Sequence, residues 1–158
     1  LGSDATAPDR SSDMFRHMQQ LMHYHRTHFR DASVMPPGKA MEMATIDAAK
    51  ALGLDNELGS IEVGKQADIV LVDMEAAHLY PKNMEAFRLI CFANGNDVDT
   101  VIIGGEIVLE NKQLTRVNQD RILTAAQQET EKMIERTSGS RFLELPEGFW
   151  NQTRYSKQ

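Results

Sequence analysis

The chain has 158 residues and carries 17 Lys and Arg against 23 Asp and Glu, which gives a formal net charge of −6. This acidic balance, with its cations scattered along the chain, disfavours nucleic acid and anionic membranes as partners, because both need clustered positive charge. Hydrophobic residues make up 41%, enough for one ordinary core, and no apolar run approaches the ~20 residues that would span a bilayer.

The first predicted helix covers residues 11–29. Apolar side chains recur there at helical spacing, and Asp13 or one of the two serines before it can serve as the N-cap. Four histidines crowd this helix: His17, His23, His25 and His28. His25 and His28 share a face, but two imidazoles lack the third ligand that a zinc site requires. The cluster therefore favours a polar helix face over a metal site.

A second helix is predicted after the Pro-Pro-Gly break at residues 36–38, which disfavours a continuous helix. It runs over residues 39–52 and ends at Gly53, which suits a C-cap. Its small residues suggest one closely packed face, made of Ala40, Ala44, Ala48 and Ala51.

The middle of the chain predicts strands. The apolar run Ile69–Val72 is short and rich in branched residues, which indicates a buried strand. Residues 101–110 hold two strand-like segments around consecutive glycines, a strong hairpin signal. We expect the run and the hairpin to share one sheet, separate from residues 1–4.

Three side chains of this region could carry chemistry but favour structural roles. Asp68 precedes a strand, where acids commonly cap turns, and His78 follows the buried strand in a loop, where a histidine is most often solvated. Cys91 lies on an apolar stretch without a partnered base, so we assign it to the core. As the single cysteine it excludes an internal disulfide and indicates a reducing compartment, so we expect a cytoplasmic protein.

A last helix is predicted over residues 118–136, and an irregular tail follows it. The tail carries aromatic side chains that we expect to dock on another surface: Phe149, Trp150 and Tyr155.

The opening "LGSD" allows two interpretations. A Gly-Ser step is typical of a cloning remnant, but the quartet can also be the end of a strand that carries the carboxylate of Asp4. Taken by itself, Asp4 gives little support to a catalytic role. The rest of the sequence favours the strand.

Four stretches resemble the C-terminal part of the amidohydrolase superfamily, in its branch of metal-dependent deaminases and chlorohydrolases that act on heterocycles. They are "LGSDATAPDRSSDMF", "AMEMATIDAAKALGL", "LGSIEVGKQADIVLVD" and "VDTVIIGGEIVLENKQL". The resemblance covers residues 1–114. It implies an α+β chain with three parts: the last strand and helices of a TIM barrel (residues 1–54), most of a small β-sandwich (55–117), and a C-terminal helix with the aromatic tail (118–158).

The resemblance assigns a role to the Ser3-Asp4 pair. Members of this family carry such a pair at the C-terminal end of the eighth barrel strand, where it faces the active site. Asp4 is therefore expected to be both a metal ligand and a catalytic residue, which takes a proton from the attacking water and passes it to the leaving amine. The expected metal is zinc or iron, and the expected substrate is a small heterocycle.

The other metal ligands of the family, a His-x-His motif and later histidines, precede this Asp and are absent here. We therefore expect a C-terminal fragment that is inactive alone, binds no stoichiometric metal, and self-associates through exposed edges and apolar faces of its two first helices into a homo-oligomer. The alternative interpretation is a non-catalytic β-rich interaction module that reuses the fold.

Overall fold

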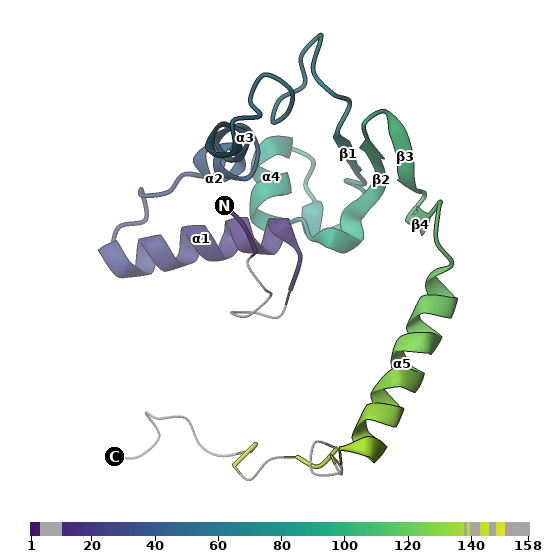
Figure 1. Cartoon of the computed structure of the whole chain (residues 1–158). Coiled ribbons are helices and arrows are strands. Elements are labelled where there is room, and N and C mark those ends of the chain that lie inside the picture. Colours follow the sequence, from purple (N-terminus) through teal and green to yellow (C-terminus); the bar gives the residue numbers. More distant parts are fainter. Residues whose placement is uncertain (4–10, 138, 140–142, 146–147, 151–158) are drawn as a thin grey trace, which may run out of the picture. The chain divides into compact units, whose positions relative to one another are not determined.

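The computed structural model describes residues 1–3, 11–137, 139, 143–145 and 148–150. It divides into two compact units, Leu1–Arg116 and Val117–Gln158. The first unit holds a group of helices and an antiparallel sheet, and the second holds one long helix (Figure 1). None of the helices in the described ranges is both long and apolar enough to cross a membrane.

Helix α1 (Met14–Phe29) confirms the first predicted helix, with its start set by Asp13. The Asp13 carboxylate accepts hydrogen bonds from the backbone nitrogens of Phe15 and Arg16, at 3.0 and 3.4 Å. Such a cap supplies acceptors for N–H groups that have no partner within the helix. The helix ends at Arg30, whose backbone turns into the left-handed region at φ 53°.

The second predicted helix is broken into α2 (Pro37–Ala44) and α3 (Ile46–Leu52). The break lies at Thr45, which leaves helical geometry with φ −125° and ψ −101°. Its side-chain hydroxyl donates to the carbonyl oxygen of Met41 at 2.7 Å, a local bond by which a threonine competes with the regular helix.

The break changes which alanines are buried. Ala40 of α2 is fully buried as predicted, but in α3 the buried alanine is Ala49, whereas Ala51 is exposed. A single 3.6-residue period cannot be extended across Thr45, so the predicted face was wrong beyond that residue.

The core of the helical part lies where α1, α2 and α4 (Glu85–Phe92) pack together (Figure 1). Its buried side chains are Met18, Met22, Ala40 and Ile90. Cys91 packs against this core, which confirms its structural assignment. Burial raises the pKa of the Cys91 thiol, which favours its protonated form.

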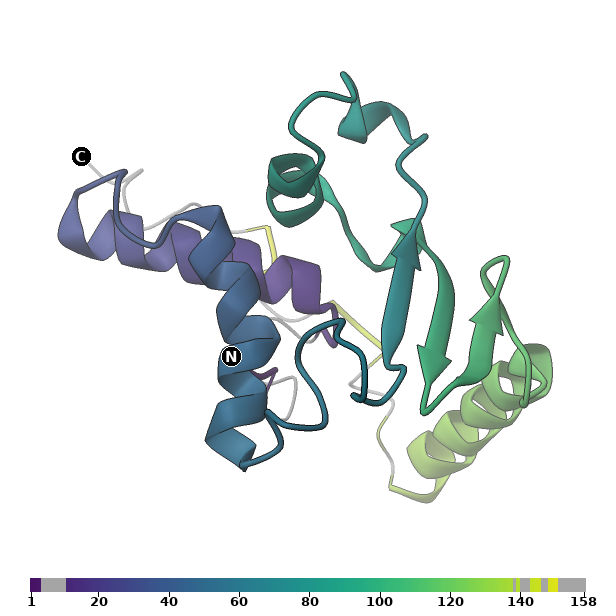
Figure 2. The same ribbon diagram turned by 90° about the horizontal axis from the view of Figure 1, so that it is seen from above.

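The sheet has four antiparallel strands in the order β1-β2-β3-β4. Figure 2 shows β1, β2 and β3 side by side. Their bounds are Ile69–Val72, Val98–Ile103, Glu106–Glu110 and Gln113–Leu114. The pairing of β1 with β2 and of β2 with β3 confirms that the run and the hairpin share one sheet. Leu1, Gly2 and Ser3 are not in a strand.

The β2–β3 turn is held by Asp68, which has the structural role that the sequence favours but bonds a turn far along the chain. Gly104 and Gly105 occupy positive φ of 56° and 83°, the combination that a tight hairpin turn requires. The Asp68 carboxylate accepts from the Gly104 nitrogen at 2.7 Å, so it caps a turn 36 residues further along the chain.

The burial predicted for β1 was wrong. Val70 is 52% exposed and Leu71 is 50% exposed. Because successive side chains of a strand point to opposite faces, both faces of the sheet are open at β1, and β1 is also an edge strand. The described residues form a single sheet, so a sandwich with a second sheet remains a prediction.

The loop between α3 and β1 closes around Lys65, whose side chain is only 10% exposed. Its ammonium donates to the carbonyl oxygen of Asp55 at 2.5 Å and to the hydroxyl of Ser60 at 2.6 Å, with the Leu58 carbonyl oxygen at 3.4 Å. Gly59 lies against α3, where an added Cβ would come within 2.8 Å of the Ala49 Cβ. Lys65 and the close approach of Gly59 to α3 therefore both help to hold the loop.

The second unit contains α5 (Gln119–Arg136), which begins at an Asn118 cap. The helix has exposed apolar side chains: Ile122, Leu123 and Met133. After it, the rings of Phe149 and Trp150 meet edge to face with centroids 4.8 Å apart. Tyr155 lies outside the described residues, and docking of the tail remains a prediction.

Candidate functional site

Asp4, the predicted catalytic and metal-binding residue, lies outside the described residues. The structure does describe the chain on both sides of it. On the N-terminal side, Leu1 packs against the helical core, and its nitrogen donates to the carbonyl oxygen of Met43 at 2.8 Å. Residues 1–3 are thereby attached to α2.

On the other side, the chain is attached through Asp13. One carboxylate oxygen, Oδ1, caps α1, and the second, Oδ2, accepts from the backbone nitrogen of Gly95 at 2.9 Å. The Asp13 nitrogen donates to the hydroxyl of Ser11 at 3.0 Å. Asp13 thus bonds simultaneously to the start of α1 and to a segment more than eighty residues away.

That segment, residues 93–97, is here called the junction loop. Gln19 of α1 donates to the Ala93 carbonyl oxygen at 2.9 Å, which gives a second bond between α1 and the junction loop. Ala93 is fully buried. The position of α1 is therefore tied to this loop at two points.

The junction loop is organised by Asp97, which is 4% exposed. Its Oδ2 accepts from the Asn94 nitrogen at 2.8 Å, from the Asn94 side-chain amide at 3.1 Å, and from His78 Nε2 at 2.9 Å. A buried carboxylate needs such donors, because an unsatisfied one is costly. The expectation that His78 is merely solvated was therefore wrong.

Sequence reasoning missed Asp97 and the junction loop. The signal was present, since Asn94 with Asp97 three residues later has the spacing of a capping box, and the structure shows that box. The partner His78 is 19 residues away. Because of this sequence separation, no local pattern indicated the pairing.

The four histidines of α1 do not converge on one point. His17 is buried, His25 contacts the Leu21 carbonyl oxygen through Nδ1 at 2.9 Å, and His28 packs edge-on against Phe29. Over the described ranges, no group of three or more His, Cys, Asp or Glu could hold a metal ion. These residues therefore do not supply a complete site for the zinc or iron that the family resemblance implies.

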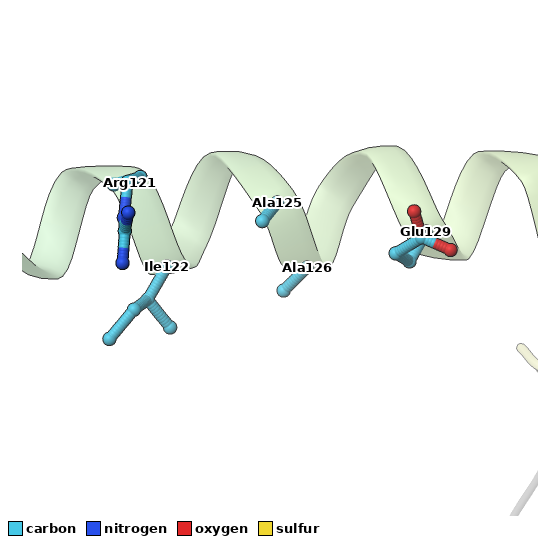
Figure 3. A pocket seen from close by; sticks show the side chains of 5 residues that line it. All are labelled: Arg121, Ile122, Ala125, Ala126 and Glu129. Carbon is cyan, nitrogen blue, oxygen red and sulfur yellow. The ribbon is translucent and has the colours of Figure 1, made fainter.

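A shallow hollow lies along one side of α5. Figure 3 shows the side chains that line it: Arg121, Ile122, Ala125, Ala126 and Glu129. All five come from this single helix, and one cation and one anion flank an apolar floor. Because no second element contributes a side chain, the hollow is not a candidate catalytic centre.

Comparison with known proteins supports the resemblance seen in the sequence. The model of the amidohydrolase family matches residues 1–108. The 5-methylthioadenosine/S-adenosylhomocysteine deaminase of Thermoanaerobacter pseudethanolicus is 38% identical over 136 residues, which are 86% of this chain and 32% of the relative. The 5'-deoxyadenosine deaminase of Methanobrevibacter smithii is 32% identical over 136 residues, 85% of this chain and 31% of the relative.

Two solved structures are also similar. An adenosine deaminase from Xanthomonas campestris with bound zinc has a TM-score of 0.79 and 30% identity, over 83% of this chain and 30% of that one. The atrazine chlorohydrolase TrzN from Arthrobacter aurescens, with zinc, has a TM-score of 0.64 at 21% identity, over 70% of this chain and 25% of that one, a likeness of fold alone. The chain spans about a third of the length of the curated relatives that it matches.

Proposed function

Because the chain belongs to the amidohydrolase family, we propose that it is the C-terminal part of a hydrolytic deaminase that acts on an aminated heterocycle. The observation that carries this proposal is the 38% identity, over 86% of the chain, to a deaminase of methylthioadenosine and S-adenosylhomocysteine. The similar deaminases named above all act on an adenosine-type nucleoside. The proposed substrate therefore carries the 6-amino group of adenine.

In this proposal water replaces the amino group at the ring carbon, and ammonia leaves. The family's metal, when bound, would supply electrophilic activation of the water. The carboxylate of Asp4 would take a proton from the attacking water and deliver it to the leaving amine. The protein would therefore neither gain nor lose a proton over the reaction. The division into residues 1–54, 55–117 and 118–158 is part of the same proposal.

The activity test compares two polypeptides. The 158-residue chain alone is expected to release no ammonia from adenosine and to bind less than one equivalent of zinc, because its described residues offer no complete donor group. A full-length protein that contains the chain is expected to release ammonia from adenosine and to bind at least one equivalent of zinc. Ammonia release and metal content by mass spectrometry are the measurements.

Turnover by the purified 158-residue chain would contradict the first expectation. A full-length protein that holds its metal but releases ammonia from no aminated purine, pyrimidine or triazine would contradict the proposed reaction. It would favour the non-catalytic interaction module instead.

We also propose that the 158-residue chain self-associates. In addition to the open strand β1, the chain has large apolar side chains on its helices that are at least 60% exposed: Tyr24, Phe29 and Leu52. Open edges and apolar surfaces favour association. Light scattering should give at least twice the monomer mass of 17.8 kDa. Val70→Lys, which places a charge on the edge strand, should reduce that mass, and a concentration-independent monomer of the unsubstituted chain would refute the proposal.

A further inference from the structure

The loop between α3 and β1 reverses the usual pattern of a surface loop, because its polar side chains bond one another while its apolar side chains are exposed. The Ser60 hydroxyl donates to the Glu62 carboxylate at 2.5 Å and accepts from the Lys65 ammonium at 2.6 Å. Among these polar residues, Ile61 is 83% exposed and Val63 is fully exposed. Ile61 and Val63 are here called the apolar tip, and Figure 1 shows their loop projecting between α3 and β1.

The charges beside the apolar tip are satisfied within the loop. The Glu62 carboxylate accepts from Ser60 and lies 3.4 Å from the Lys65 ammonium. The hydrogen bond from Ser60, followed by that from Lys65, keeps the pKa of Glu62 below its ordinary value, so the carboxylate stays charged. The loop therefore needs no partner for its charges, whereas its two aliphatic side chains have no cover within the described residues.

The loop that carries the apolar tip is closed at its base. The Gln66 nitrogen donates to the Glu57 carbonyl oxygen at 2.9 Å, and the Lys65 ammonium bonds the Asp55 carbonyl oxygen at 2.5 Å. The side-chain amide of Gln66 also donates to the Glu57 carboxylate at 3.0 Å. A surface that is ordered before it binds loses less conformational entropy when a partner covers it. The apolar tip is thus arranged in advance for an apolar pocket.

We propose that the apolar tip docks into an apolar pocket on the part of the full-length polypeptide that lies outside this chain. The inference rests on the proposed function only in taking the chain as the C-terminal part of a longer protein. The matched residues make up 32% of a deaminase relative, so most of such a polypeptide lies outside the structure. A pocket on the same polypeptide has a high effective concentration at the tip, which a separate partner lacks.

The charges around the apolar tip also restrict the pocket. The side chains of Glu57 and Glu62 are exposed on the same loop. Because like charges that face each other across an interface are costly, the rim of the pocket should carry Lys or Arg rather than Asp or Glu.

Thiol accessibility of Val63→Cys tests the proposal. The substitution is made in a Cys91→Ala background, both in the 158-residue chain and in the full-length protein. Each rate of reaction with a maleimide is divided by the rate of the same protein in urea. In the chain alone the two rates should agree within about threefold, since the site is exposed. In the full-length protein the native rate should be about 100-fold lower and independent of protein concentration.

A second measurement keeps Cys91. Val63→Asp should shift the thermal midpoint of the 158-residue chain by no more than about 1 °C, because a fully exposed side chain loses no contact. In the full-length protein it should lower the midpoint by about 5 °C, because the carboxylate would enter an apolar pocket. Asn56→Asp is the matched control: it adds the same charge at an exposed position of the same loop and should shift neither midpoint.

Equal thiol protection in the two proteins, or equal effects of Val63→Asp on both midpoints, would overturn the proposal. Protection that rises with protein concentration would also overturn it, because a second copy would then cover the tip. If the Cys91→Ala background does not fold, the two midpoints decide. Failure of the proposed function would look different: the full-length protein would release no ammonia, but its Val63→Cys thiol would still be protected.

Discussion

Asp4→Asn in a full-length, active protein is expected to lower kcat by about 10²–10⁴-fold, the range that general acid–base catalysis contributes. The amide keeps the size of the carboxylate and most of its hydrogen bonds, but it cannot accept the proton from the attacking water. KM should change much less, because the lost interaction belongs mainly to the transition state. Loss of the negative charge should also weaken metal binding, so metal content is measured beside the kinetics.

Asp9→Asn is the control for Asp4, since it makes the same chemical change past the predicted strand end and should cost little. From sequence position alone, Asp13 would be an equally neutral control. Its bonds to Phe15 and Gly95 exclude that use. Near-normal turnover of Asp4→Asn with full metal content would refute the assignment of the Ser3-Asp4 pair.

Gly59→Ala is expected to destabilise the first unit by about 3 kcal/mol, the sum of overpacking and a left-handed backbone. Gly59 has φ +88°, which a residue with a side chain rarely adopts. Its Cβ would also lie 2.8 Å from the Ala49 Cβ and 2.9 Å from the Ile46 Cα, so α3 or the loop must move. The midpoint of urea unfolding measures the effect.

Gly64→Ala separates the two causes of that loss. Gly64 has a similar φ of +96°, but nothing lies within 4 Å of its added Cβ. It should therefore lose only the conformational part, about 1–2 kcal/mol. Equal losses in the two variants would show that the contact with α3 contributes nothing.

Local patterns in the sequence predicted the elements well. The spacing of apolar residues and the Asp13 cap predicted α1, and consecutive glycines predicted the β2–β3 turn. These features depend on residues close together in the chain or on a backbone geometry that few residue types allow. Asp68 also has the structural role that its place before a strand indicates, but the turn that it bonds lies 36 residues away, which the sequence did not indicate.

The predictions that were wrong concern features that depend on residues distant in the sequence. Helical geometry is interrupted at Thr45, so a helical period extended through it gave the wrong buried alanine. The apolar run of β1 indicated burial, but burial needs a layer over each face, and both faces are open in the described residues. His78 and Asp97 meet only in the folded chain. For Asp4, the family resemblance supplied a role that composition and spacing alone did not.

Lys65 makes its loop independent of dissolved cations. Loops with several converging oxygens often need calcium or another ion from solution, and they open when a chelator removes it. Here the oxygens of Asp55, Ser60 and Leu58 surround an ammonium that is covalently part of the chain. Neither dilution nor a chelator can therefore remove this cation. Chelators should leave this loop closed. A loss of structure on chelation would therefore have to arise elsewhere than in this loop.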